Sequence, residues 1–277
     1  MTPPAPAPAR GRSRRRGAWL LLVLALAAGC GNGSRDAGTG GQAPATPTTV
    51  PATTAAAAAK PCLQGAAAAE PVRFTSPAGA TLVGAVLGDG RAGLVLGHQV
   101  GSDLCEWLPQ AEAFAGRGYQ VLAFDFAGYG GSQAGSGPDA RVDTDVVAAA
   151  EQLRRRGAEK IVLIGSSMGG TAVLSAATRI RPPVAGVVSL SGPASFQGVD
   201  AGAAVSRLRV PVLLVAGADD QPFVDDARAM YRAAPVRDKR LLVVPGGGHG
   251  TSLLEFGEDA PKVLAAVRRF AADHTRG

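Results

Sequence analysis

The sequence predicts an α/β protein with a mostly parallel sheet of about eight strands and helices on both faces of the sheet. The first observation is that short aliphatic runs alternate with longer amphipathic stretches beyond residue 69, as strands alternate with crossover helices. The second is that the short runs are continuously apolar, which is typical of strands buried on both faces. With 277 residues, 46% of them hydrophobic, the chain is long enough for one such domain.

The predicted elements follow one another in a regular order. Runs at 72–75 and 81–87, separated by Pro-Ala-Gly at 77–79, indicate a hairpin at one edge of the sheet. Further strands are expected at 93–97, 119–126, 160–164, 184–190, 210–216 and 240–244. Helices are expected at 104–117, 138–156, 168–178, 223–233 and 253–272.

The ends of the helices carry signals of their own. Gly118 and Gly157 follow two of the amphipathic stretches and end them. The stretch at 138–156 begins with acidic and ends with basic residues, which suits the dipole of a helix. Roughly 20 residues separate the strands at 184–190 and 210–216, enough for one crossover helix. The sequence therefore predicts no large cap over the sheet.

The first 29 residues have the composition of an export signal. Arginines between residues 10 and 16 precede an apolar run at 18–28, which is shorter than the roughly 20 residues that a membrane-spanning helix needs. The residues before Cys30, Leu-Ala-Ala-Gly, resemble the lipobox of bacterial lipoproteins. The resemblance implies a signal peptide at 1–29 and a lipid-modified Cys30 as the first residue of the mature protein. We expect an exported protein, anchored on the extracytoplasmic face of the cell membrane or secreted in a fully cleaved, soluble form.

Residues 30–68 are predicted to form a disordered tether between the lipid anchor and a domain at 69–277. Up to about residue 59 the segment consists mostly of Gly, Ala, Thr, Pro and Ser, with almost no large apolar side chain. Such a composition cannot bury enough surface to offset the entropy that is lost on ordering.

The net charge of +6 does not indicate a protein that binds nucleic acid. Five arginines between residues 10 and 16 lie in the export signal, and without them the net charge falls to +1. The domain therefore has no electrostatic reason to bind polyanions. No His or Cys spacing typical of a metal site occurs, and we expect neither a metal nor a cofactor.

Two cysteines, Cys62 and Cys105, follow Cys30. Export places them in an oxidising compartment, where an even number of cysteines favours a disulfide. Two separate buried thiols are the alternative.

A serine nucleophile is predicted at Ser167. The strand at 160–164 leads directly into Gly-Ser-Ser-Met-Gly at 165–169, and a helix-favouring stretch follows. A turn this sharp strains the backbone of the serine and leaves no room for side chains two residues before and after it, where the sequence has glycine. Ser166 lacks glycines at those spacings. In a chain with 38 glycines the five-residue string is weak evidence by itself, so the prediction rests on the strand and the helix around it.

The serine needs a base, and the chain contains three histidines. His249 lies in a glycine-rich loop between the strand at 240–244 and the last helix, and it is the predicted general base. His98 ends an early strand. His274 is expected in an exposed polar tail beyond the last helix.

These features resemble the α/β-hydrolase superfamily, in particular its serine esterases and lipases and the capless dienelactone-hydrolase type. The resemblance extends over about residues 71–273 and includes residues 125–132, similar to the family's structural segment D-x-x-G-x-G-x-S. In this family the acid follows the serine and precedes the histidine, commonly as the last residue of G-x-x-D. The resemblance implies that Asp220 is the acid, with the adjacent Asp219 as the alternative.

The resemblance also implies two backbone donors for the oxyanion that forms during acyl transfer. The N–H of Met168 is the first. The second lies in Gly-His-Gln-Val-Gly at 97–101, which is similar to the family's His-Gly-x loop but has Gln99 in place of the glycine. By position the donor is the N–H of Val100, with the N–H of Gln99 as the alternative. His98 then has a structural role.

Taken together, the resemblance implies hydrolysis of a carboxylic ester through an acyl-enzyme, with a small-molecule or lipid ester as the substrate. Without a cap, and with 5% aromatic residues, we expect a shallow, open site for short acyl chains or an exposed large substrate. A peptidase or an acyltransferase with the same three residues is the alternative, because the triad does not define which molecule accepts the acyl group. A surface-binding lipoprotein without turnover is the alternative from another class.

Overall fold

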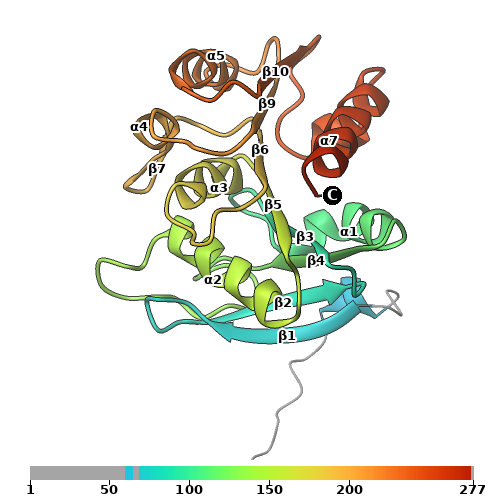
Figure 1. The fold of residues 1–277 in the computed structure, drawn as a ribbon, viewed down its shortest axis with the longest axis vertical. Coiled ribbons are helices and arrows are strands. Elements are labelled where there is room, and N and C mark those ends of the chain that lie inside the picture. The colour runs from blue at the N-terminus through green and yellow to red at the C-terminus, as the bar shows by residue number, and fades with distance from the viewer. Residues whose placement is uncertain (1–59, 65–68, 276–277) are drawn as a thin grey trace, which may run out of the picture. The chain divides into compact units, whose positions relative to one another are not determined.

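The strands of the main sheet lie in the order β1-β2-β4-β3-β5-β6-β9-β10 in the computed structural model (Figure 1). The structure describes residues 60–64 and 69–275. β1 pairs with β2, and β2 with β4, in antiparallel fashion, whereas all other neighbours in this sheet are parallel. The predicted edge hairpin and the mostly parallel sheet of about eight strands are confirmed.

The bounds of the elements are as follows. The strands of the main sheet are β1 (Ala69–Thr75), β2 (Thr81–Leu87), β3 (Ala92–Gly97), β4 (Tyr119–Phe124), β5 (Lys160–Ser166), β6 (Gly186–Leu190), β9 (Val212–Gly217) and β10 (Lys239–Val244). The α-helices are α1 (Leu108–Ala115), α2 (Val142–Arg155), α3 (Met168–Ala177), α4 (Ala201–Val205), α5 (Phe223–Ala233), α6 (Ser252–Glu255) and α7 (Ala260–Thr275). Two short 3-10 helices are Pro61–Leu63 and Leu104–Trp107.

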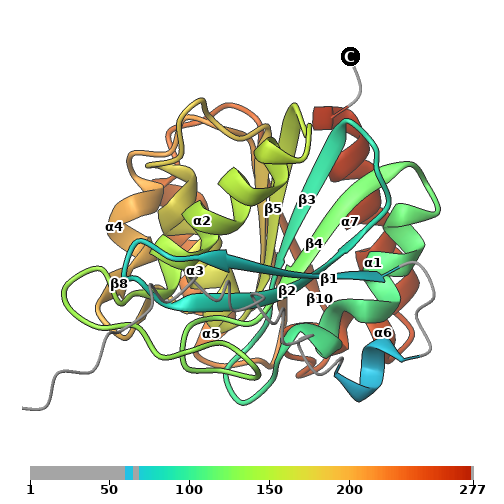
Figure 2. The ribbon, with the colours of Figure 1, turned by 90° about the horizontal axis from the view of Figure 1, so that it is seen from below.

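Helices cover both faces of the sheet. Figure 2 shows α2, α3, α4 and α5 on one side of the strands and α1, α6 and α7 on the other. Each side has its own cluster of buried apolar side chains, and the sheet separates the two clusters. In such sheets ligands bind at the edge where the parallel strands end, because loops from several strands meet there.

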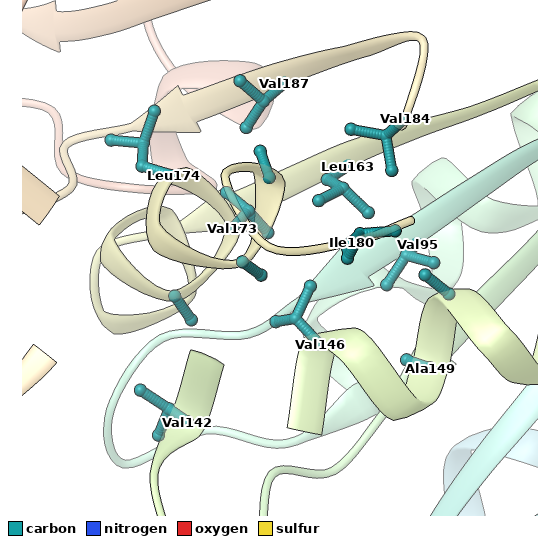
Figure 3. Close-up of a cluster of buried hydrophobic side chains, with 14 of the residues drawn as sticks. Val95, Val142, Val146, Ala149, Leu163, Val173, Leu174, Ile180, Val184 and Val187 are labelled. Atoms are coloured by element: carbon teal, nitrogen blue, oxygen red, sulfur yellow. The ribbon is translucent and has the colours of Figure 1, made fainter. Parts of the chain in front are cut away.

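β5 shows why the predicted strands are continuously apolar. Ile161 and Leu163 belong to the cluster beside α2 and α3, whereas Val162 and Ile164 belong to the cluster beside α1 and α7. None of the four is more than 1% exposed. Figure 3 shows Leu163 close to Val173 of α3. Burial stabilises the fold by roughly 1.5–3 kcal/mol for each such side chain, and it holds the strand that leads into the serine turn.

The segment between β6 and β9 does not form the single crossover helix that the sequence indicates. It forms a small hairpin, β7 (Ser195–Phe196) and β8 (Val199–Asp200), followed by the short helix α4. Gln197 and Gly198 have φ angles of 42° and 78°, as the tight turn of a two-residue hairpin requires. No large cap is inserted in this segment, in agreement with the sequence.

Two predicted helices begin later than the sequence indicates. At 104–117 the chain first forms the 3-10 helix Leu104–Trp107, where the carboxylate of Asp103 accepts the N–H of Cys105 at 2.8 Å. At 138–156 the helix begins only at Val142, because the backbone of Arg141 is extended, with φ −134° and ψ 140°.

The last predicted helix is divided into two. α6 ends before Gly257, whose φ of 85° is a left-handed conformation that does not continue a helix. α7 continues to Thr275, so the prediction that His274 lies in an exposed tail beyond the last helix is wrong. The ring of His274 has Nδ1 2.7 Å from the carbonyl oxygen of Phe270 and Nε2 2.9 Å from Asp238 Oδ2, and its side chain is 11% exposed.

The predicted signal peptide, Cys30 and most of the predicted tether lie outside the described residues. Residues 60–64, at the end of that tether, form a 3-10 turn with Leu63 buried against the domain. Among the residues that the structure describes, no helix has both the length and the apolarity to cross a membrane.

Asp145 on α2 generates a prediction about stability. Its side chain is buried, accepts the N–H of Ala127 at 2.9 Å, and has its pKa raised to about 6, chiefly because burial disfavours the charged form. The folded state therefore binds a proton that the unfolded state releases, and this group should reduce the free energy of unfolding by about 3 kcal/mol as the pH rises from about 4 to about 6. Asp145→Asn, which keeps an acceptor for the N–H, should lose less stability over this range in urea unfolding. Parallel pH curves for the two proteins would contradict the prediction.

Candidate active site

Ser167 lies between the end of β5 and the start of α3, at the point where the strand turns into the helix. Its backbone has φ 49° and ψ −113°, a strained conformation for a residue other than glycine. The N–H of Ser167 donates to the carbonyl oxygen of Leu190, at the end of β6, at 2.8 Å. The turn is thus held by the neighbouring strand as well as by its own helix.

The glycines around this turn are required by close backbone contacts. A β-carbon at Gly165 would overlap the carbonyl group of Gly169, and a β-carbon at Gly169 would overlap the carbonyl group of Gly97. Gly169 also donates its N–H to the carbonyl oxygen of His98 at 3.2 Å. The start of α3 therefore lies directly against the end of β3 and the loop that follows it.

The structure places Asp220, rather than Asp219, against the predicted base. His249 Nδ1 is 2.9 Å from Asp220 Oδ2 and 3.1 Å from Asp220 Oδ1. Asp220 is 8% exposed, whereas Asp219 is exposed and donates its backbone N–H to Gly246 at 3.0 Å as a turn residue. With Nδ1–H donated to the carboxylate, Nε2 of His249 is free to accept a proton from a hydroxyl group.

The loop that carries His249 is attached to the serine turn by a neighbouring residue. The N–H of Thr251 donates to Ser166 Oγ at 3.1 Å. The ring of Phe223, at the start of α5, lies over the ring of His249 with a centroid distance of 4.4 Å. Among the described residues Ser167 Oγ makes no hydrogen bond, and in free hydrolases the bond between serine and histidine often forms only with substrate.

The three N–H groups predicted as oxyanion donors differ in their contacts. The N–H of Gln99 donates to Glu106 Oε2 at 3.1 Å and is therefore engaged. The N–H groups of Met168 and Val100 donate to no other group of the described residues. Met168 is the first residue of α3, where the helix dipole favours negative charge. The geometry thus favours Val100 over the alternative Gln99 as the partner of Met168.

His98 binds the backbone on both sides of its ring. Its Nδ1 is 2.7 Å from the carbonyl oxygen of Gln99, and its Nε2 accepts the N–H of Phe126 at 3.1 Å. A neutral ring with the proton on Nδ1 satisfies both contacts. Burial lowers the pKa of His98, which favours this neutral form. His98 is therefore placed to hold the loop rather than to transfer protons.

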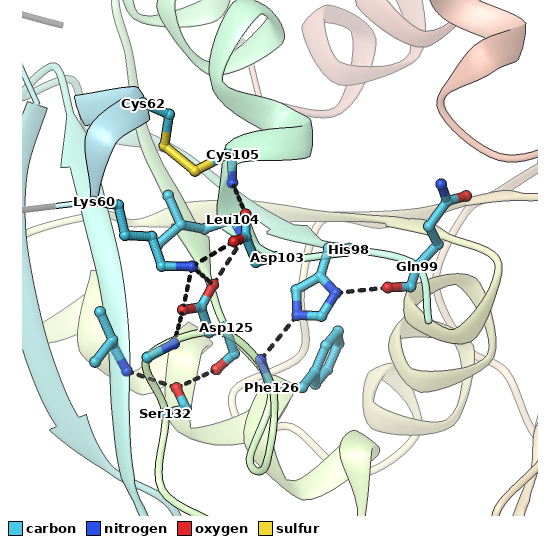
Figure 4. A network of polar contacts seen from close by, with 12 residues as sticks. Lys60, Cys62, His98, Gln99, Asp103, Leu104, Cys105, Asp125, Phe126 and Ser132 are labelled. Carbon is cyan, nitrogen blue, oxygen red and sulfur yellow. Dashed lines mark hydrogen bonds and ion pairs between the residues drawn. A yellow bond between two sulfur atoms is a disulfide. The ribbon is translucent and has the colours of Figure 1, made fainter. Parts of the chain in front are cut away.

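The segment at 125–132 is organised around the buried carboxylate of Asp125 (Figure 4). Its Oδ1 accepts the N–H of Leu104 at 2.7 Å, and its Oδ2 accepts the N–H of Gly131 at 2.7 Å. The Nζ of Lys60 lies 2.6 Å from Oδ2 and 2.9 Å from Asp103 Oδ2, so a cation upstream of β1 neutralises the buried acid.

A disulfide joins Cys62 to Cys105, with a Cα–Cα distance of 5.9 Å (Figure 4). Cys105 belongs to the 3-10 helix that follows the oxyanion loop, and Cys62 belongs to the turn that follows Lys60. Residues 60–64 are therefore bound to the domain beside this loop. No group of three or more His, Cys, Asp or Glu side chains in the described part of the chain is placed to hold a metal ion.

Glu106 is the residue of this site that sequence reasoning missed. It stands in Leu-Cys-Glu-Trp-Leu at 104–108, so a single acid among apolar residues was the only available signal. Such an acid ordinarily faces solvent on an amphipathic helix.

A sheet of this order, with a strained serine turn after β5 and an acid and a histidine after β9 and β10, defines an α/β-hydrolase-type protein. A family model described as "alpha/beta hydrolase fold" matches residues 92–201. Two uncharacterized proteins of Mycobacterium tuberculosis, Rv2307c and MT2364, are each 30% identical to the chain in an alignment of 208 residues that covers 67% of this chain and 71% of theirs. The chain belongs to the α/β-hydrolase superfamily.

Solved structures share this fold at low sequence identity. The Pyrococcus furiosus esterase Pf2001 superposes with a TM-score of 0.61 at 18% identity, covering 76% of this chain and 93% of its own. The Rhodococcus esterase RhEst1 superposes with a TM-score of 0.61 at 20% identity, covering 74% of this chain and 99% of its own. A dienelactone hydrolase from Anabaena variabilis superposes with a TM-score of 0.59 at 20% identity, covering 75% of this chain and 99% of its own.

Proposed function

We propose that the chain is a serine hydrolase that cleaves carboxylic esters through an acyl-enzyme. The observation that carries the proposal is the hydrogen-bonded pair of His249 and Asp220 beside a serine on a strained strand-to-helix turn. These groups are the nucleophile, base and orienting acid that acyl transfer requires. The esterases among the structural neighbours, and the superfamily itself, support the same reaction class.

In the proposed first step, Ser167 Oγ attacks the carbonyl carbon of the ester while Nε2 of His249 takes the hydroxyl proton. The carboxylate of Asp220 stabilises the imidazolium that forms. The carbonyl oxygen becomes an oxyanion and accepts the N–H groups of Met168 and Val100. When the carbon–oxygen bond breaks, the leaving alcohol receives the proton from His249, and the acyl group stays on Ser167.

In the second step a water molecule replaces the alcohol. His249 takes a proton from the water as it attacks the acyl carbon, and the same two N–H groups hold the second oxyanion. Return of the proton to Ser167 Oγ releases the carboxylic acid and restores the free enzyme. No step requires a metal or a cofactor.

The proposed substrate is a small-molecule or lipid ester that reaches an uncapped site. The segment between β6 and β9 forms only a small hairpin and a short helix. Val100, beside the proposed oxyanion position, is 53% exposed and Phe256, in the loop after the His249 segment, is 72% exposed. Exposed apolar side chains on two loops at this edge favour an ester with an apolar part.

We also propose that the enzyme is exported and anchored to the membrane through a lipid on Cys30, on the strength of the lipobox-like residues before it. Cells that express the wild-type chain and are fed a clickable fatty-acid analogue should incorporate it into this protein, and Cys30→Ser should abolish the incorporation. Equal labelling of both proteins would contradict a lipid on Cys30, and unlabelled wild type in the culture medium would support the soluble, secreted form.

The reaction class is tested with a fluorophosphonate probe, which reacts only with activated serines. The wild-type chain should be labelled and Ser167→Ala should not, because the probe bonds to the nucleophilic oxygen. Ser206→Ala, at an exposed serine that follows α4, is the control and should be labelled as the wild type is. Failure of the wild-type protein to react would favour the surface-binding alternative. Labelling without hydrolysis of a series of p-nitrophenyl esters would favour a peptidase or an acyltransferase.

The choice between the two adjacent acids gives a paired prediction. Asp220→Asn should lower kcat by about 10³-fold or more, because the amide no longer holds the histidine in the required tautomer. Asp219→Asn should change kcat by less than about threefold, because the contact of Asp219 with Gly246 is made by its backbone. Ester hydrolysis by the two purified variants measures both effects. Similar losses in both would show that the assignment of the acid is wrong.

A further inference from the structure

Glu106 lies where the oxyanion loop, the serine turn and the loop that carries His249 meet. It is mostly buried, and its Oε2 accepts the N–H of Gln99 at 3.1 Å. Burial raises the pKa of the Glu106 carboxyl, while the N–H of Gln99 and the nearby hydroxyl groups of Ser102, Ser166 and Thr251 act in the opposite direction. Its Oε1 is inaccessible to solvent and has no hydrogen-bond partner of good geometry among the described residues.

The neighbours of Glu106 form a compact polar cluster. Ser166 Oγ donates to Gln99 Oε1 at 3.3 Å and accepts the N–H of Thr251 at 3.1 Å. A β-carbon at Gly250 would overlap Ser166 Oγ and lie only 2.6 Å from Gln99 Oε1, so the cluster has no spare room. Gln99 precedes Val100, Ser166 precedes Ser167, and Thr251 follows His249 by two residues. The cluster thus touches the oxyanion loop, the serine turn and the loop that carries His249.

The piece of chain that carries Glu106 is fixed from its other side. It belongs to the 3-10 helix Leu104–Trp107, whose first N–H is accepted by the buried Asp125 at 2.7 Å. The disulfide to Cys62 holds the next residue, Cys105 (Figure 4). Glu106 is therefore attached to a rigid support rather than to a free loop.

Both peptide units that flank Gln99 are held in place. Glu106 accepts the N–H of the unit before the Cα of Gln99, and His98 Nδ1–H donates to the carbonyl oxygen of the unit after it at 2.7 Å. A trans peptide unit is planar, with its N–H pointing opposite to its carbonyl group. The N–H of Val100 belongs to the second unit, so fixing both units fixes the direction of this N–H.

We propose that Glu106 is a positioning residue that, together with His98, aims the N–H of Val100 at the oxyanion. The inference rests on the proposed function, because it assigns the support of a donor in that reaction. It also accounts for Gln99 in place of the family's glycine. The side chain of Gln99 accepts a hydrogen bond from Ser166. The backbone N–H of Gln99 donates to Glu106, so it is not available to the substrate.

The experiment compares Glu106→Ala with Glu106→Gln and Glu106→Asp in the full chain, using a p-nitrophenyl ester and a trifluoromethyl ketone. The ketone forms a hemiketal with the serine and places an oxyanion in the same position as the substrate does. Glu106→Ala should lower kcat by about 10- to 100-fold with KM nearly unchanged. A donor that is misplaced by about 1 Å stabilises the transition state less well, whereas binding of the ground-state substrate is hardly affected. Its affinity for the ketone should fall by a similar factor.

The two conservative variants separate hydrogen bonding from charge. Glu106→Gln keeps an acceptor at the same distance and should retain kcat within about threefold. Glu106→Asp keeps the charge but withdraws it by one methylene, and should lose more activity than Glu106→Gln. If Glu106→Ala does not fold, this order of the two other variants still tests the inference.

Asp145→Ala is the matched control. Asp145 is also a buried acid that accepts one backbone N–H and has an unpartnered second oxygen, but it contacts Ala127 instead of a catalytic segment. The Asp145→Ala variant should have a lower melting temperature than the wild type, but its kcat and its affinity for the ketone should change by no more than about twofold.

Unchanged kcat in Glu106→Ala or Glu106→Asp, or equal losses of kcat in Glu106→Ala and Asp145→Ala, would overturn the inference while leaving the proposed function intact. Absence of turnover by the wild-type chain would instead overturn the proposed function and this inference with it.

Discussion

The close approach of three backbones at the end of β5 is the constraint on which the rest of the structure depends. Gly165 permits the sharp turn at Ser167, and Gly169 lets the start of α3 lie against the carbonyl group of Gly97 at the end of β3. A serine with φ of 49° persists only where its surroundings leave no alternative, and here the apolar clusters on both faces of β5 provide that rigidity. The serine proposed as the nucleophile, the start of α3 and the proposed oxyanion loop are thus brought together mainly by backbone contacts.

The oxyanion loop shows how a departure from a family pattern is accommodated. Glycine brings no polar side chain to such a position, whereas Gln99 brings an amide that needs partners when buried. Ser166 and Glu106 supply contacts to the side chain and the backbone of Gln99. In a site of low dielectric, dipoles that are already oriented need no reorganisation as charge develops on the substrate. The same polar groups therefore satisfy Gln99 and stiffen the loop.

Local patterns in the sequence were sufficient for the strands of the main sheet, for the turn that holds Ser167 and for the loop positions of Asp220 and His249, because these depend on short apolar runs and glycine turns. The sequence could not reveal the role of Glu106, since its burial depends on Gln99, Ser166 and Thr251, which are distant along the chain or in another loop. His274 was misplaced for a similar reason. The helix around it continues to Thr275, and the contact with Asp238 comes from the turn before β10.

The pairing of Lys60 with Asp125 moves the boundary of the domain. By composition the folded part begins near residue 69, and a chain cut there would keep every strand of the main sheet. It would also enclose a carboxylate without the cation that balances it, and such an unpaired buried charge is strongly destabilising. Cys105 would lose its partner at the same time. The smallest unit that contains both this cation and the disulfide therefore begins at Lys60, and residues 60–64 belong to the framework of the folded protein.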